Sequence, residues 1–152
     1  MFATRSDLLA RSNARRIAKL AVPADFDFPQ SERALRELIE GGDIASYPAN
    51  EQAALKLALD AVDKCLADAD ALLLSYGIPP EVKNTLLARL SSTVALYYLQ
   101  GGERMTEDVQ DAYNAVIALL DKYQRGLLPG LVPVEPDKGG IAEIQSSPRR
   151  YG

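Results

Sequence analysis

The sequence contains no histidine and only one cysteine, Cys65, among its 152 residues. Without histidine, the commonest general base and the commonest metal ligand are absent, and so are Ser-His and Cys-His nucleophile pairs and the usual zinc sets. A single cysteine cannot form an intramolecular disulfide or a thiolate metal cage. We therefore expect a protein that binds other proteins and is not an enzyme, with no metal and no cofactor.

Long apolar runs are also missing from the sequence. No stretch of about 18 apolar residues occurs, so no membrane-spanning segment and no membrane partner are predicted. The opening residues, MFATRSDLLARSNARR, are interrupted by charge and lack the apolar core of a signal peptide. We expect synthesis in the cytoplasm.

Charge is unevenly distributed along the chain. Residues 1–20 carry five basic residues and one acidic residue, whereas residues 21–126 carry nine basic and seventeen acidic ones. An acidic body repels the phosphates of nucleic acids, so only the first predicted helix offers a basic patch. Arg11, Arg15 and Lys19 lie four residues apart and form a basic ridge on this helix. A solvated face is its ordinary interpretation, and a contact with an acidic partner is the alternative.

The hydrophobic pattern predicts an all-α bundle of four main helices and one short helix. The main helices are expected at about 6–20, 51–75, 79–99 and 106–125, and the short one at about 31–40. Apolar residues spaced four and three apart define the core face of the longest helix: Leu55, Leu59, Val62, Leu66, Ala69 and Leu73. Asn50 and Pro79-Pro80 are the predicted starts of two helices, and Gly126 is the predicted end of the last. The helix over 79–99 is apolar nearly all round, which predicts a central position and places Tyr97 and Tyr98 in the core.

Residues 127–152 are predicted to form an extended arm, separate from a helical domain over residues 1–126. Four of the nine prolines and four of the ten glycines fall in this segment, a composition that disfavours helix. We expect the arm to make few contacts with its own body, either as a frayed terminus or as a segment that orders against a partner. Its expected contact residues are apolar anchors and a basic, aromatic tip: Leu131, Val134, Ile141, Ile144, Arg149, Arg150 and Tyr151.

Acidic side chains occur in pairs that could hold magnesium or act as acid and base. These are Asp60 with Asp63, Asp68 with Asp70, and Glu107 with Asp108 and Asp111. Each lies on the polar face of a helix otherwise built for packing, so a solvated face is favoured. A carboxylate- and magnesium-dependent enzyme, such as a nuclease or a nucleotide hydrolase, stays as a less favoured alternative.

Taken in order, the segments resemble those of the Mu-type tailed-phage connector family. The opening matches a Met-aromatic-Ala-Thr-basic-x-Asp-Leu pattern, from Met1 to Leu8. A long helix rich in Ala and Asp then ends in an aromatic residue, Tyr76, before a proline turn. The remaining matching features are the aromatic pair Tyr97-Tyr98, the Glu107-x-Val109-x-x-x-Tyr113 helix that closes at Gly126, and the closing Ser146-Ser147-Pro148-Arg149 followed by Tyr151. Residues 21–49 depart from the family and look like a divergent loop or an insertion.

The resemblance implies a head-completion or head–tail adaptor protein of a tailed phage. Such a protein would form a ring, commonly twelvefold, in the neck of the virion beneath the portal and around the DNA exit channel. Its partners would be copies of itself, the portal protein and further neck or tail-completion proteins, with DNA only as passing cargo. For the arm, the resemblance favours a place on a neighbouring subunit or on the portal-side partner over a frayed terminus. A cellular helical adaptor that binds another protein through its long helix is the principal alternative.

Overall fold

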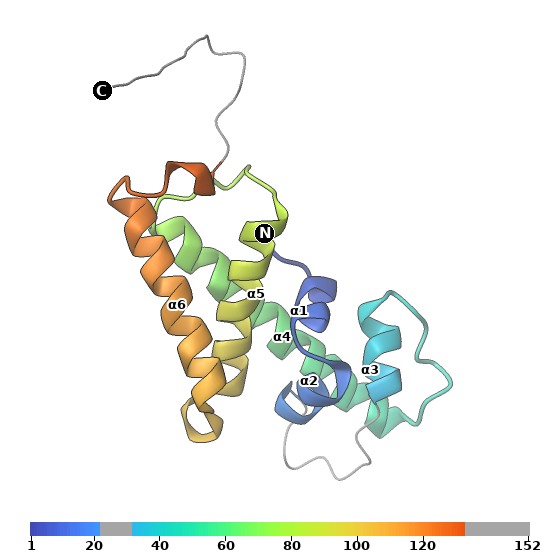
Figure 1. Ribbon diagram of the computed structural model, residues 1–152. Helices are drawn as coiled ribbons and strands as arrows, with labels where there is room; N and C mark the ends of the chain where they lie inside the picture. Colours follow the sequence, from blue (N-terminus) through green and yellow to red (C-terminus); the bar gives the residue numbers. More distant parts are fainter. Residues whose placement is uncertain (22–31, 133–152) are drawn as a thin grey trace, which may run out of the picture.

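The computed structural model describes residues 1–21 and 32–132, apart from the side chains of Ala14, Arg15, Ala18 and Glu32 (Figure 1). These residues form helices and no strand, which confirms the predicted all-α class. The α-helices are α1 (Arg5–Arg11), α2 (Ala14–Ala21), α3 (Glu32–Ile39), α4 (Ala49–Ser75), α5 (Thr85–Gln100) and α6 (Glu107–Gln124). Two 3-10 helices accompany them, η1 (Gly102–Arg104) and η2 (Pro129–Leu131).

The long helix α4 and the helix α5 pack along each other and form the centre of the molecule. α6 covers one side of α5, while α1, α2 and α3 lie on its other side and also contact α4 (Figure 1). The predicted core face of α4 is confirmed, since Leu55, Val62, Leu66 and Leu73 are each at most 2% exposed. Only Leu59 of that face is half-buried.

α5 is the central helix, as its composition predicted. Ten of its sixteen residues are buried, and they include the polar residues Ser91, Ser92, Thr93 and Gln100. The Ser92 hydroxyl donates to the carbonyl of Ala88 at 2.6 Å, and the Thr93 hydroxyl donates to the carbonyl of Arg89 at 2.9 Å. These bonds to the preceding helical turn satisfy both hydroxyls, so they can be buried at little cost.

The single helix predicted over 6–20 is wrong, because the chain breaks at Ser12 and Asn13 into α1 and α2. Ser12 leaves the helical conformation with φ −120° and ψ −133°. The Asn13 side chain then accepts a hydrogen bond from the backbone N–H of Arg16 at 2.8 Å. Asparagine satisfies the free N–H groups of a helix start better than most residues, so it begins α2 here instead of continuing α1. The break lets Leu8, Leu9 and Ile17 all reach the core.

Two predicted helix starts are also wrong. α4 begins after Pro48, which makes Asn50 a residue of the helix and not its cap. Residues 79–84 are not helical, and α5 begins only after Asn84, whose side chain accepts from the N–H of Leu87 at 2.8 Å. A side-chain acceptor that reaches the first turn defines the start of α5 more strongly than the prolines do.

The segment after α6 folds back onto the helical body. Gly126, at φ 79°, ends α6 as predicted, with the N–H of Leu127 donating to the carbonyl of Lys122 at 2.9 Å. Pro129 then opens η2, and Leu131 is only 6% exposed within the core. The prediction that the body ends at Gly126 is therefore wrong for residues up to Val132. Burial of the Leu131 side chain provides the free energy that orders this short segment.

Candidate interaction groove

At least one member of each predicted acidic group makes a contact within the fold. The Arg5 guanidinium binds both carboxylate oxygens of Asp63, and Asp70 accepts a hydrogen bond from the N–H of Phe2 at 2.9 Å. Asp108 accepts a hydrogen bond from the Thr106 hydroxyl at the start of α6. Across residues 1–21 and 32–132, no group of three or more potential metal ligands comes together.

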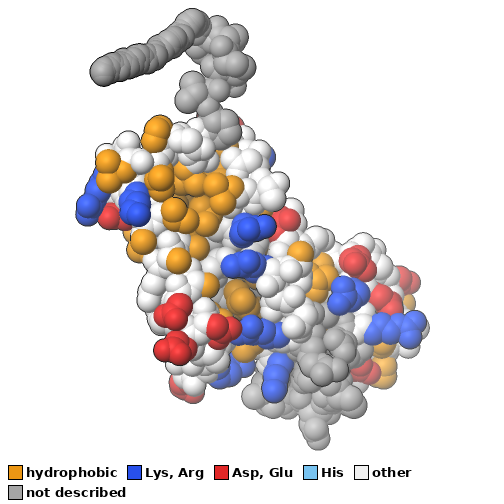
Figure 2. Space-filling view, viewed as in Figure 1, with side chains coloured by type: hydrophobic (Ala, Val, Ile, Leu, Met, Phe, Trp, Pro, Cys, Tyr) orange, Lys and Arg blue, Asp and Glu red, His pale blue; other side chains and the backbone are white. Residues whose placement is uncertain are grey.

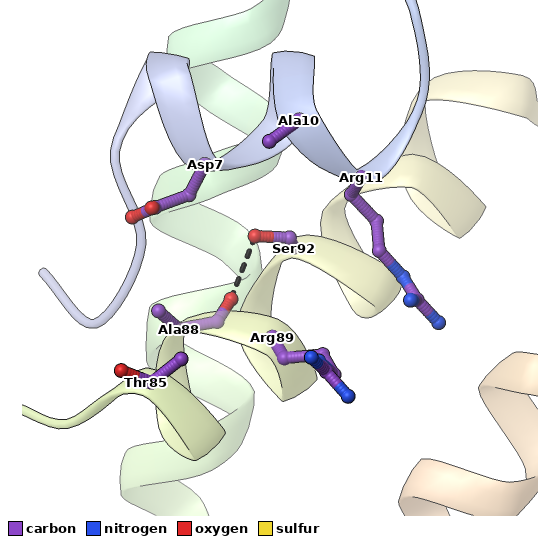
Figure 3. Close-up of a pocket in the computed structure, with 7 residues that line it drawn as sticks. All are labelled: Asp7, Ala10, Arg11, Thr85, Ala88, Arg89 and Ser92. Atoms are coloured by element: carbon purple, nitrogen blue, oxygen red, sulfur yellow. Dashed lines mark hydrogen bonds between the residues drawn. The ribbon is translucent and has the colours of Figure 1, made fainter.

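A pocket of about 240 Å³ opens between α1 and α5. Arg11 of α1 and Arg89 of α5 stand at one side of it, with Ser92 in its floor (Figure 3). Both guanidinium groups point to the same side of the pocket, whereas the carboxylate of Asp7 points to the opposite side (Figure 3). Two cations thus project together from two different helices.

A second pocket of about 210 Å³ adjoins the first, since Arg11 lines both. Arg16 and Thr93 line it on one side, and Asp108, Val109 and Ala112 of α6 line it on the other. The two pockets follow each other along α5 as one groove, lined by α1 at the first pocket and by α1, α2 and the first turns of α6 at the second. We call it the basic groove, after its three cations Arg11, Arg16 and Arg89.

Hydrogen bonds hold two of the three cations of the basic groove in place. The Arg11 Nε donates to the Thr93 hydroxyl at 3.0 Å, and the Arg16 Nη2 donates to the Gln100 side chain at 2.9 Å. Both acceptors are neutral, so these bonds position the guanidinium groups without neutralising them. Arg89 is exposed, and its guanidinium has no hydrogen-bond or ion-pair partner among the residues that the structure describes.

The two carboxylates at the basic groove are engaged at helix starts. Asp7 accepts from the N–H of Thr4 at 2.8 Å, in a capping box with the Thr4 hydroxyl. The hydrogen bond from the Thr106 hydroxyl lowers the pKa of Asp108, so this carboxylate is ionised at neutral pH. Figure 2 shows Lys and Arg side chains in a column down this face, with acidic side chains beside it over the lower part of α6.

The basic ridge predicted on one helix is not formed as such. Arg11 belongs to α1 and Lys19 to α2, so the break at Ser12 and Asn13 removes their four-residue register. Lys19 is exposed, and the side chain of Arg15 lies outside the described part. Arg89 was not predicted as a site residue from the sequence. It is the one charged residue among the sixteen residues of α5, and a lone charge on an apolar helix was the feature that could have identified it.

An apolar hollow lies at the other end of the bundle, where α4 and α6 end. Leu74, Tyr76, Tyr123, Pro129 and Val132 line this cavity of about 700 Å³. Figure 2 shows hydrophobic side chains gathered at this end of the visible face.

Of the seven predicted contact residues of the arm, the structure describes only Leu131. Leu131 is buried in the core of its own chain, which corrects its assignment as an anchor for a partner. The other six lie beyond the residues that the structure describes: Val134, Ile141, Ile144, Arg149, Arg150 and Tyr151.

Tyr97, Tyr98 and Cys65 are parts of the packing. The ring of Tyr97 stacks on that of Tyr113 at 3.7 Å between centroids and 10° between planes, which joins α5 to α6. Tyr97 and Tyr98 are half-buried against the core, in a less enclosed position than the sequence predicted. Burial raises the pKa of the Cys65 thiol to about 11, so it is protonated at neutral pH.

The fold defines an all-α helical protein whose described helices are too short or too polar to cross a membrane. Residues 2–136 match the family model described as Bacteriophage Mu, Gp36. The chain therefore belongs to this family of phage proteins. The matched range includes residues 21–49, which we expected to diverge. Searches of the curated proteins and of the solved structures gave no match.

Proposed function

We propose that the protein is a structural subunit of a phage head–tail connector, an adaptor ring docked beneath the portal around the DNA exit channel. The observation that carries this proposal is membership of the phage Mu family over residues 2–136. The ring is twelvefold in this proposal, and its partners are the portal protein and further neck or tail-completion proteins. Its location is the neck of the virion.

The distribution of charge is consistent with a ring that DNA passes through. The chain has a net charge of −4, and its acidic residues are concentrated after the first twenty residues. Such a surface repels phosphates, so DNA would be cargo and not a tightly bound ligand. In this proposal the protein acts by binding its partners and not by catalysis.

A conditional null mutation of the gene in its phage tests the proposal. We expect cells infected with this mutant to accumulate DNA-filled heads and free tails that do not join, as seen by electron microscopy of the lysate. Supplying the protein from a plasmid should restore joined particles. Normal numbers of complete, infectious particles without the protein would contradict the proposal.

A further inference from the structure

The basic groove holds three cations, Arg11, Arg16 and Arg89, against two carboxylates, Asp7 and Asp108, which are engaged at helix starts. Arg11 and Arg89 project together from α1 and α5, and neither guanidinium is paired with a carboxylate among the described residues (Figure 3). Two adjacent cations repel each other, and an anionic group placed against both would relieve that repulsion. The pair of cations favours an anionic occupant.

The outer edge of α6 offers acidic side chains. Val109, Val116 and Leu120 are the buried residues of α6, and they face α5. At 100° per residue, Glu107 and Asp111 lie on the opposite side of the helix, and both are exposed. No basic residue occurs in α6 before Lys122, so its first turns form an acidic edge.

The acidic edge and the basic groove are separate patches of one molecule, on two sides of the first turns of α6. α5 forms the floor of the groove, with α1 on one side and α6 on the other (Figure 1). The outer side of α6 faces away from α5 and hence away from the groove of the same chain. Two different surfaces that complement each other produce a head-to-tail contact, which closes into a ring when the rotation between subunits allows.

We infer that the basic groove of one subunit receives the acidic first turns of α6 of a second copy of the chain. Glu107 and Asp111 of the second copy would meet Arg11 and Arg89. A DNA duplex is a less suitable occupant, because its dense phosphate charge is repelled by a chain of net charge −4 more strongly than a second copy is, which presents only a local acidic edge to the groove. This inference rests on the proposed function, since it names the contact between subunits of the ring.

Charge reversal on the full chain tests the inference by sedimentation velocity over a range of protein and salt concentrations. The groove variant is Arg11→Glu/Arg89→Glu, and the edge variant is Glu107→Lys/Asp111→Lys. Each alone brings like charges together, so we expect self-association to weaken at least about tenfold relative to wild type. Mixing the two variants pairs opposite charges again, and we expect association to be restored. Arg89→Glu alone, which breaks no hydrogen bond of the fold, should weaken association with an unchanged circular dichroism melt.

The matched control is Lys56→Glu/Lys64→Glu, which makes the same change in net charge on the exposed face of α4 and should leave association unchanged. Wild-type protein that stays monomeric at low salt, or mixed variants that do not associate, would overturn the inference. The inference would also be overturned if the wild-type protein bound a DNA duplex and the groove variant lost that binding while its self-association stayed the same. None of these results would contradict the head–tail proposal. That proposal is tested separately, by the particles that the null mutant of the phage forms.

Discussion

Arg5 and Asp63 join the start of the chain to the middle of α4 through two parallel hydrogen bonds. The Arg5 Nε donates to Asp63 Oδ1 and the Arg5 Nη2 donates to Asp63 Oδ2, each at 2.7 Å, across 58 positions of sequence. Fork-to-fork geometry of this kind is the most favourable for a carboxylate and a guanidinium. The pair anchors α1, and with it Arg11, relative to the bundle.

The first prediction is that this pair stabilises the fold in a pH-dependent way. The hydrogen bonds from Arg5 lower the pKa of Asp63, so the stabilisation is present at neutral pH and is lost as the pH falls below about 4. Because both side chains are 40% exposed, Asp63→Asn should lose only about 0.5–1 kcal/mol at pH 7. Urea unfolding at pH 7 and in steps below pH 4 measures this difference, which should shrink as the pH falls and vanish once the pH is below the lowered pKa of Asp63.

Asp68→Asn is the control for that experiment. Asp68 pairs with Lys64 at 3.8 Å on an exposed part of the same helix, so its loss should change the free energy of unfolding very little. Equal effects of the two substitutions at pH 7 would show that the bidentate geometry carries no special stability.

The second prediction concerns the core face of α4. Leu66 is 2% exposed, so Leu66→Ala should lower the free energy of unfolding by about 2–5 kcal/mol. Leu57 is 46% exposed on the same helix, and Leu57→Ala should change it by less than about 0.5 kcal/mol. Chemical denaturation of both variants compares a buried with an exposed leucine, and similar losses in the two would place the core face elsewhere.

The third prediction locates the end of the folded body. A chain truncated after Gly126 loses the buried Leu131, so its melting temperature should fall. Truncation after Val132 keeps that side chain and should leave the melting temperature unchanged. Differential scanning calorimetry decides between them, with Leu127→Ala as a control at a 63% exposed position. An unaltered melting temperature after truncation at Gly126 would mean that η2 adds no stability.

The fourth prediction is that the single thiol is slow to react in the native protein. Because burial raises the pKa of Cys65 to about 11, its thiolate fraction at pH 8 should be about 100-fold lower than that of an ordinary cysteine. Alkylation measured by mass spectrometry should therefore be slow in buffer, faster as the pH rises, and fast in urea. Equal rates in the native and the denatured chain at pH 8 would contradict the raised pKa and the half-buried position of this thiol.

The packing of the long helices was predictable from the sequence because it depends on a repeated pattern. The apolar spacing from Leu55 to Leu73 lies within one helix, and each residue of the pattern supports the same face. The apolar character of α5 likewise predicted its central place. Gly126 was predictable as a helix end because only glycine adopts its positive φ without strain.

Helix starts were less predictable, because they depend on which of several nearby polar residues reaches a free N–H. Asn13 begins a helix where the sequence predicted no start, and Asn84 caps α5 where the sequence also offered Pro79-Pro80. The burial of Leu131 depends on tertiary packing, and it cannot be predicted from the proline- and glycine-rich composition of the surrounding segment. The basic groove joins Arg11 to Arg89 across 78 positions, a proximity that the separate helical patterns did not contain.

Electron cryomicroscopy of the neck of purified phage particles tests the central claim most directly. The account predicts a ring between portal and tail in which each subunit fits the bundle of α4, α5 and α6, with the basic groove of one subunit against α6 of the next. A neck whose rings are fully accounted for by other proteins, with this chain absent from the particle by mass spectrometry, would contradict it.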